Sequence, residues 1–154
     1  MDTTPNPAQD HYKRPDWFTR NVMNRFLNLM MRLGLSVRGS RVLEHRGRTS
    51  GELHHTPVNL LTIDGVDYLV APRGETQWVR NVRAAGGRLV LILGRRRQSR
   101  TATEIPPAEA TDILRTYLRR WKFEVGMFFD GVGPDSSEAE FAAVADRHPV
   151  FRLG

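Results

Sequence analysis

Apolar residues recur in several short stretches between residues 40 and 105, and these stretches are candidate β-strands. A continuous apolar run at 89–93 predicts instead a strand that is buried on both faces. Asp64-Gly65 separates two of the stretches and predicts a two-residue hairpin of type I′. A turn is expected at 95–97. The predicted strands are 41–46, 53–63, 66–70, 89–93 and 98–105.

A helical pattern interrupts the strands after residue 75. Thr76 is a suitable N-cap for a short helix, and Gly86-Gly87 is expected to end that helix. Trp78 and Val82 lie one turn apart on it, so both side chains are predicted to pack inward.

The C-terminal third of the chain adds further helices. One is predicted to begin at Pro106-Pro107 and a short one near residues 138–146, while the apolar tail at 148–153 is expected to dock as an edge strand. Strands interleaved with a few helices, and mostly linked by hairpins, indicate an antiparallel barrel with helices packed outside. The predicted fold class is therefore mainly β, with flanking helices (α+β).

The N-terminal segment has a different pattern. Residues 1–15 are polar and are expected to be a flexible lead-in, with no secretory signal, and a single domain is expected over 16–154. Residues 16–33 predict an amphipathic helix with apolar residues on one face and arginines on the other. Two interpretations stay open: its apolar face caps a sheet, or the basic helix rests on a membrane surface.

Composition narrows the choice of function. The 154 residues suit one domain. The chain has no cysteine, which excludes disulfides and thiolate metal sites and is compatible with a cytoplasmic location. The net charge of +6 comes mainly from arginine and attracts phosphates, whether these belong to a cofactor, a nucleic acid or an anionic lipid.

The turn at residues 47–51 carries the donors that a phosphate group needs. Gly47 and Gly51 permit backbone conformations that expose N–H groups, Arg48 supplies a guanidinium group, and Thr49 and Ser50 supply hydroxyls. Taken alone, this turn is equally compatible with a basic surface connection.

A second turn strengthens the interpretation as an anion site. Arg73-Gly74 places another arginine at the end of a predicted strand, and Arg80 and Arg83 follow on the next helix. Arginines from separate segments are thus expected to gather around one anionic ligand.

Other candidate sites are weaker. His54 and His55 are neighbours on a predicted strand, so their side chains point to opposite faces and are not expected to share a metal ion, with His45 or alone. Arginines at 95–97 form a charge run of the kind that is usually solvated, and nucleic-acid binding is not expected, because no aromatic residues are interleaved with them. Aromatic residues at 123–129 suit either core packing or one wall of an apolar substrate pocket.

Several of these motifs, in this order and spacing, resemble the deazaflavin-dependent nitroreductase family. That family has the split β-barrel shared with flavin-dependent pyridoxamine-phosphate oxidases. The resemblance covers residues 40–105 most strongly. Its motifs are Gly47-Arg48-Thr49-Ser50-Gly51, Thr56-Pro57, Asp64-Gly65, Val70-Ala71, Arg73-Gly74 and Trp78-Val79-Arg80-Asn81-Val82-Arg83-Ala84.

The resemblance implies binding of coenzyme F-420, a deazaflavin with a phosphate and a polyglutamate tail; flavin mononucleotide (FMN) is the less favoured cofactor. The turn at 47–51 and Arg73-Gly74 would lie along the phosphate and tail, and backbone groups at 57–59 and 71–72 would face the ring. The cofactor-binding residues implied in this way are Arg48, Thr49, Ser50, Gly51, Pro57, Val58, Asn59, Ala71, Pro72, Arg73, Gly74, Trp78, Asn81 and Arg83.

The activity that the resemblance implies is hydride transfer from the reduced cofactor to a lipophilic, electron-poor acceptor: a quinone, an enone or a nitroaromatic compound. No catalytic side chain is identified, and Tyr68, Tyr117 or a histidine are candidate proton donors. The loop at 74–77 is shorter than in proven nitroreductases of the family, which suggests a neighbouring subgroup. The alternative is a non-enzymatic barrel that binds a fatty acid, haem or flavin; a homodimer and a peripheral position on the inner membrane face through 16–33 are compatible with either.

Overall fold

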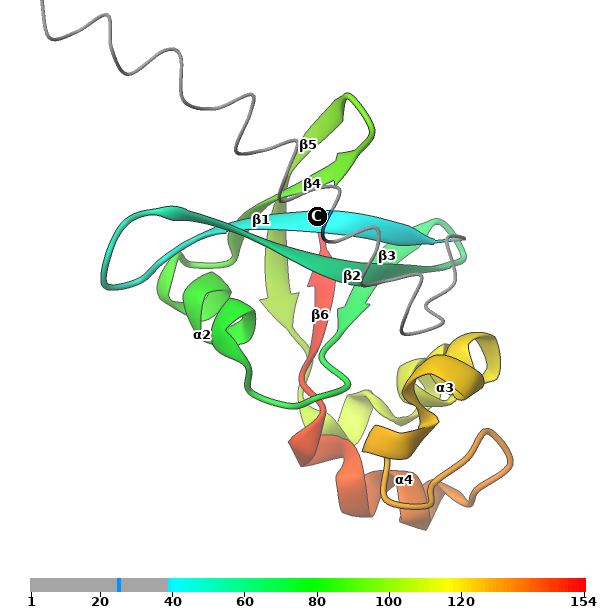
Figure 1. Cartoon of the computed structure of the whole chain (residues 1–154). Helices are drawn as coiled ribbons and strands as arrows, with labels where there is room; N and C mark the ends of the chain where they lie inside the picture. Colours follow the sequence, from blue (N-terminus) through cyan, green and yellow to red (C-terminus); the bar gives the residue numbers. More distant parts are fainter. Residues whose placement is uncertain (1–24, 26–38) are drawn as a thin grey trace, which may run out of the picture. The chain divides into compact units, whose positions relative to one another are not determined.

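Six strands of this chain close into an antiparallel barrel, with helices outside it (Figure 1). The computed structural model describes residue 25 and residues 39–154. The strand order is β1-β2-β3-β6-β5-β4, and β4 pairs back with β1. The predicted fold class, mainly β with flanking helices, is thereby confirmed. The strands are β1 (Ser40–Arg46), β2 (Leu53–Ile63), β3 (Val66–Val70), β4 (Arg88–Leu93), β5 (Arg96–Glu104) and β6 (Val150–Leu153).

The hairpin between β2 and β3 has the predicted geometry. Asp64 and Gly65 have φ angles of 49° and 78°, and Ile63 pairs directly with Val66. Positive φ at both central residues is the hallmark of a type I′ turn, whose twist matches that of the flanking strands. The prediction of this hairpin is confirmed.

The hairpin between β4 and β5 is tighter than predicted. Its turn is Gly94-Arg95 and not 95–97, because Arg96 already pairs with Leu93. Gly94 has a φ of 58°, a left-handed conformation that suits glycine and permits a two-residue turn. The strand predicted at 89–93 is also less buried than expected, since Leu93 is 48% exposed.

The C-terminal strand β6 is not the edge strand that the sequence suggested. It pairs with β3 on one side and with β5 on the other, so it closes the barrel. Its side chains explain this position: Val150 packs into the apolar cluster outside the barrel, while Phe151 packs into the cluster inside. A strand with apolar side chains on both faces is more stable between two neighbouring strands than at an exposed edge, where its backbone groups would be unpaired.

Helix α2 (Gln77–Ala84) covers the barrel interior. Trp78, Val79 and Val82 are buried on it, and the Trp78 ring lies 5.7 Å from the Phe151 ring. The helix ends at Gly86-Gly87, as predicted, and Gly87 allows a close approach of the chain to β5. A Cβ atom at Gly87 would lie 2.1 Å from the carbonyl oxygen of Ala102, so only glycine fits there.

A second apolar cluster lies outside the barrel, beneath α3 (Thr111–Val125) and α4 (Glu138–Val144). Tyr117, Trp121, Phe129 and Phe141 are its large buried side chains. The helix predicted from Pro106-Pro107 begins as a short 3₁₀ turn. The 3₁₀ segments are η2 (Pro107–Glu109), η3 (Gly126–Phe128) and η4 (Ala145–Arg147).

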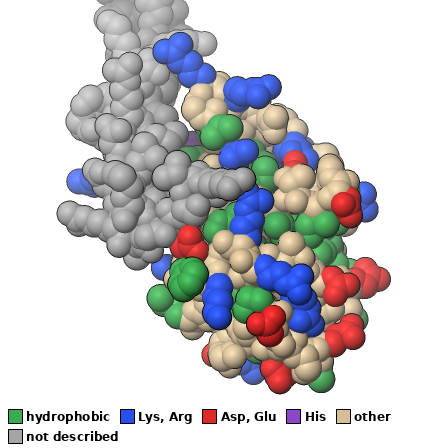
Figure 2. Space-filling view, turned by 90° about the vertical axis from the view of Figure 1, so that its right-hand side faces the viewer, with side chains coloured by type: hydrophobic (Ala, Val, Ile, Leu, Met, Phe, Trp, Pro, Cys, Tyr) green, Lys and Arg blue, Asp and Glu red, His purple; other side chains and the backbone are tan. Residues whose placement is uncertain are grey.

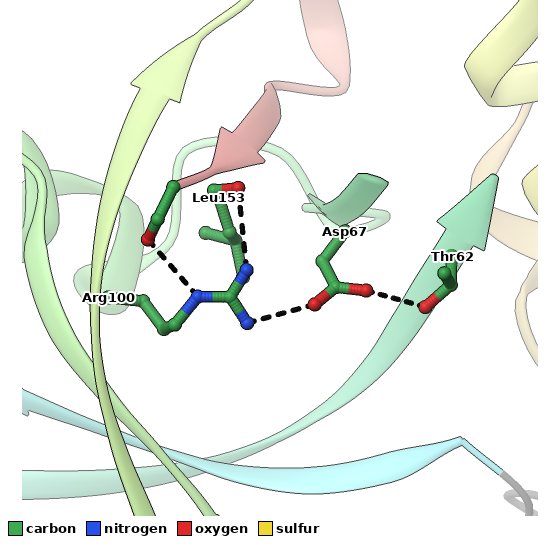
Figure 3. Close-up of polar contacts among 5 residues, drawn as sticks. Thr62, Asp67, Arg100 and Leu153 are labelled. Carbon is green, nitrogen blue, oxygen red and sulfur yellow. Dashed lines mark hydrogen bonds and ion pairs between the residues drawn. The ribbon is translucent and has the colours of Figure 1, made fainter. Parts of the chain in front are cut away.

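Arg100 joins the strands where the barrel closes (Figure 3). Its Nη1 donates to Asp67 at 2.8 Å and its Nε donates to the carbonyl oxygen of Gly154 at 3.1 Å, while Thr62 donates to the other oxygen of Asp67 at 2.6 Å. Burial acts to raise the pKa of Asp67, but the hydrogen bonds from Thr62 and Arg100 outweigh it and hold that pKa below its ordinary value. The contact therefore links β2, β3, β5 and the residue after β6.

The N-terminal helix predicted at 16–33 lies outside the described residues apart from Arg25, which is helical and exposed. Residues 1–15 also lie outside them. In residue 25 and residues 39–154, no helix has the length and apolar character needed to cross a bilayer.

Candidate functional site

A cavity of about 460 Å³ opens between the β1–β2 turn, the start of β2 and helix α2. In Figure 1 these elements lie together on the left of the barrel. Its lining residues are polar side chains and one glycine, and their carbon atoms contribute much of the cavity surface. The residues that line it are His45, Gly47, Arg48, Thr49, Ser50, His54, His55, Thr56, Gln77 and Asn81.

The turn between β1 and β2 leaves two backbone N–H groups available to a ligand. Gly47 and Gly51 close it: the Gly47 amide donates to the carbonyl of Glu52 at 2.7 Å, and the Gly51 amide donates to the carbonyl of Gly47 at 2.9 Å. Within the described part of the chain, the amides of Thr49 and Ser50 have no hydrogen-bond partner. Adjacent unpaired amides in a turn form a concave site for an anion.

Gly47 is required by the packing of this turn. A Cβ atom there would lie 2.6 Å from the Ser50 hydroxyl and 3.0 Å from the Nε2 atom of His54. The missing side chain thus leaves room for two polar groups on the wall of the cavity.

Arg48 is exposed, yet α2 holds it in place. Its backbone amide donates to the Oδ1 atom of Asn81 at 3.2 Å, and its Nη1 atom donates both to that oxygen and to Oε1 of Gln77, each at 2.8 Å. Both acceptors are neutral amides, and no carboxylate of the described residues pairs with Arg48. Its positive charge is therefore fixed in position and not neutralised.

Asn81 and His45 lie beneath Arg48 and are 4% and 3% exposed. The Nδ2 atom of Asn81 lies 3.0 Å from Nδ1 of His45, and Nε2 of His45 lies 3.0 Å from the Thr56 hydroxyl. Burial, and secondarily the positive charges that His54 and His55 carry when protonated, lowers the pKa of His45 to about 4. His45 is consequently neutral at physiological pH.

The other two histidines have different surroundings. His54 stacks on His45 with 5.7 Å between the ring centroids. His55 pairs with Glu44 at 3.0 Å, and Arg97 contacts the second oxygen of that carboxylate at 2.6 Å. Burial acts to raise the pKa of Glu44, but hydrogen bonds from Arg97 and His55 outweigh it and lower that pKa, so Glu44 stays ionised. His54 and His55 thus have different partners, although both line the cavity.

The structure brings together one group of the predicted site residues. Arg48, Thr49, Ser50 and Asn81 line the cavity, and Gly51 completes the turn. Of the residues expected to face the ring, Pro57, Val58 and Asn59 continue along β2 and are half-buried or buried.

A second group lies at the end of β3 and does not line this cavity. Ala71 is buried in the barrel core, and the Pro72 carbonyl accepts a hydrogen bond from Nδ1 of His148 at 2.9 Å. Arg73 lies over the Phe128 ring, 5.1 Å from its centroid. Gly74 has a φ of 86°, and a Cβ atom there would lie 3.1 Å from the Arg147 carbonyl.

Two predicted residues on α2 have other partners. Trp78 is packed in the barrel core and is 6% exposed. Arg83 is bound by two carboxylates: its Nη1 contacts Glu75 at 2.9 Å and its Nε donates to Glu104 at 2.9 Å. These hydrogen bonds raise the pKa of the Arg83 guanidinium. The charge of Arg83 is thus compensated within the chain.

The cavity also contains residues that sequence reasoning did not assign to it. His45, Thr56 and Gln77 belong to this group, as do His54 and His55. One signal was present for Gln77, because it lies four residues before Asn81 and hence on the same face of a helix. No such local signal exists for His45, and Thr56 was noted only as part of the Thr56-Pro57 motif. The approach of these two residues depends on strand pairing.

The aromatic segment at 123–129 divides between core and surface. Phe129 is fully buried, whereas Phe123 and Met127 are 96% and 79% exposed. Figure 2 shows the side of the molecule that carries α3 and α4, where apolar patches lie among basic and acidic side chains. Tyr117 is buried in the outer cluster, and this burial raises its pKa despite an opposing hydrogen bond with Asn59, so it is a poor proton donor.

Comparison with known proteins extends these findings. A model of the F420H(2)-dependent quinone reductase family matches residues 17–125. Among curated proteins, none matches the chain.

Solved structures share the fold. One is an F420-H2 dependent reductase designated FDR-A, with a TM-score of 0.53 and 19% identity over 76% of this chain and 95% of that one. Another is described as a domain-swapped dimer, with a TM-score of 0.54 and 19% identity over 91% of this chain and 99% of that one. A protein of unknown function from Agrobacterium tumefaciens has a TM-score of 0.54 and 18% identity over 75% of this chain and 47% of that one.

Proposed function

Because this chain belongs to the F420H(2)-dependent quinone reductase family, we propose that it reduces a lipophilic, electron-poor acceptor of the quinone class. Family membership makes it an oxidoreductase whose cofactor is coenzyme F-420. Enones and nitroaromatic compounds are the other acceptors that the proposal includes.

The observation that carries the proposal is the fixed and uncompensated charge of Arg48 beside two unpaired amides. Coenzyme F-420 ends in a phosphate and a polyglutamate tail, which are anionic at neutral pH. Arg48, the amides of Thr49 and Ser50, and their hydroxyls are hydrogen-bond donors that suit such a group. The residues of this cavity therefore fit the anionic end of the cofactor.

The remaining predicted residues keep their places in the proposal as far as their contacts allow. The segments at 57–59 and 71–74 are proposed to contact the remaining parts of the cofactor. Trp78 supports α2 from the core, and Arg83 is assigned a structural role because Glu75 and Glu104 already bind it.

The chemistry is that of the cofactor: when bound in its reduced form, coenzyme F-420 supplies a hydride. The protein then has to bind and orient it. Arg48 and the 47–51 turn would hold the anionic end. Because the cofactor supplies the hydride, no side chain of the protein needs to act as a nucleophile.

We further propose a membrane contact through residues 16–33 and a homodimer. The basic and apolar faces of the 16–33 sequence support the membrane contact, and a lipophilic acceptor would be found there. Deleting residues 1–33 should reduce partitioning onto anionic liposomes; unchanged partitioning would remove this part of the proposal. Analytical ultracentrifugation measures the oligomeric state.

Parallel titration with coenzyme F-420 and with FMN tests the proposed function. We expect coenzyme F-420 to bind at micromolar concentration and the reduced cofactor to be oxidised by quinones in a screen that also includes enones and nitroaromatics. Arg119→Ala, which removes an exposed arginine of α3 that does not line the cavity, is the matched control for loss of charge in Arg48→Ala. Binding of FMN without binding of coenzyme F-420 would contradict the proposal.

A further inference from the structure

The cavity contains a chain of hydrogen bonds whose directions can be worked out from one end. Arg48 supplies the starting point, because its backbone amide and its Nη1 atom both donate to one side-chain atom of Asn81. Only the carbonyl oxygen of that side chain can accept two hydrogen bonds from N–H donors. The amide of Asn81 therefore has a single orientation, with its NH₂ group toward His45.

The orientation of Asn81 determines which nitrogen of His45 carries the proton. The NH₂ group donates to Nδ1 of His45 across 3.0 Å, so Nδ1 must be the unprotonated, accepting nitrogen. The ring proton is then on Nε2, which donates to the Thr56 hydroxyl oxygen across 3.0 Å. His45 and Asn81 are both buried, which favours these direct contacts over exchange with bulk water.

The direction of this chain leaves the hydroxyl hydrogen of Thr56 unused. A hydroxyl group donates one hydrogen bond and accepts up to two, and the Thr56 oxygen already accepts one from His45. Thr56 lines the cavity, so its hydrogen is available to an acceptor atom of a ligand there.

The same contacts select the part of Arg48 that a ligand meets. The two hydrogens of Nη1 are taken by Asn81 and Gln77. Nε and Nη2 have no partner among the described residues, and together they form one edge of the guanidinium group. Such an edge binds two oxygens of one phosphate or carboxylate in parallel.

From this we propose that Thr56 is a further ligand-binding residue of the cavity, and that His45 and Asn81 are positioning residues that orient Thr56 and Arg48 as donors. The ligand that this donor set takes is a phosphate or carboxylate oxygen, since the hydrogens left free on the Thr56 hydroxyl and on Nε and Nη2 of Arg48 all need an acceptor. The inference rests on the proposed function only in assigning that oxygen to coenzyme F-420.

Nuclear magnetic resonance of the ¹⁵N-labelled wild-type protein tests the positioning step without any variant. We expect His45 to be neutral with its proton on Nε2. Asn81→Asp keeps the acceptor for Arg48 but replaces the donor to Nδ1, so in that variant His45 should become doubly protonated. A neutral wild-type ring protonated on Nδ1 would overturn the inference.

Ligand affinity tests the role of Thr56. Thr56→Val preserves the shape and removes the hydroxyl, and it should weaken binding of coenzyme F-420 about tenfold, as expected for one hydrogen bond to a charged group. Thr103→Val, at an exposed threonine of β5, should leave affinity unchanged. Equal affinity of Thr56→Val and wild type would overturn the inference.

The proposed function and this inference can fail separately. If the wild-type protein does not bind coenzyme F-420, the proposed function is wrong. The inference is then decided by titration with inorganic phosphate, which should bind more weakly to Thr56→Val than to wild type. Phosphate affinity that is the same in both, or a ring proton on the other nitrogen, would reject it.

Discussion

Arg48 contacts helix α2, and Arg83 belongs to it. Both were predicted to bind an anionic cofactor, but the partners of their guanidinium groups differ. The Nη1 of Arg48 donates to the side-chain amides of Gln77 and Asn81, which are neutral. Arg83 is bound by the carboxylates of Glu75 and Glu104. One arginine is held in place with its charge intact, and the other is held in place and neutralised.

This difference shows how a chain can place a binding cation without cancelling it. An amide oxygen fixes the geometry of a guanidinium group by hydrogen bonding and adds no negative charge. A carboxylate fixes the same geometry but satisfies the charge as well. The nature of the anchoring side chain thus separates a site that binds an anion from a structural ion pair.

The largest expected effect is a loss of folding stability at acidic pH, and it comes from His45 beneath Arg48. The pKa of His45 is lowered from 6.5 to about 4, so the folded protein resists protonation that the unfolded chain accepts. Stability from this group is present above about pH 6.5 and is lost as the pH falls toward 4, by roughly 3 kcal/mol in total. Chemical denaturation at several pH values measures this loss.

His45→Gln removes the titrating group and is the control for that measurement. The decline in the free energy of unfolding between pH 6.5 and 4 should become shallower in this variant. Burial lowers the pKa of His148 too, so part of the decline should persist. A hydrogen bond with Arg83 lowers the pKa of Glu75 from its ordinary value of 4.5, so the stability that Glu75 contributes is lost only below about pH 4.5. A slope unaltered by His45→Gln would show that the pKa of His45 is not depressed.

The next effect is on ligand affinity. Arg48→Ala should weaken binding of coenzyme F-420 about 30-fold, because roughly 2 kcal/mol is typical of hydrogen bonds to a charged group. Arg83→Ala should change affinity by less than about twofold, provided the fold is intact, because exposed ion pairs contribute little. Fluorescence titration measures both. Equal losses in the two variants would remove the distinction between the two arginines.

A smaller and sharper change converts one kind of anchor into the other. Gln77→Glu keeps the size and the acceptor oxygen of the side chain but gives Arg48 a carboxylate partner, as Arg83 has. Affinity for coenzyme F-420 should then fall about fivefold, by about 1 kcal/mol, with Arg48 still in place. The loss should become smaller at acidic pH, where the introduced carboxyl group is protonated. Unchanged affinity at neutral pH would mean that compensation of the charge does not matter.

Local patterns were sufficient to predict much of the barrel and part of the site. The Asp64-Gly65 hairpin and the buried face of α2 follow from turn chemistry and helical spacing. The turn at 47–51 was recognised from its glycines and donors, because these properties belong to consecutive residues. Each of these features is decided within a few residues of the chain.

Features that depend on packing could not be found in this way. Asn81 meets Arg48 across 33 positions of the sequence, and only the placement of α2 over the β1–β2 turn brings them together. Thr56 meets His45 through the pairing register of β1 and β2. The compensation of Arg83 depends on Glu104, which lies on a strand 21 residues later.

The position of β6 between β3 and β5 has a consequence for the order of events during synthesis. When the first five strands have left the ribosome, β3 and β5 each have one unpaired edge, and both edges stay open until residues 150–153 arrive. Open edges of this kind pair readily with those of other molecules. A chain that ends before Val150 is therefore expected to expose both edges and to aggregate more readily than the full chain.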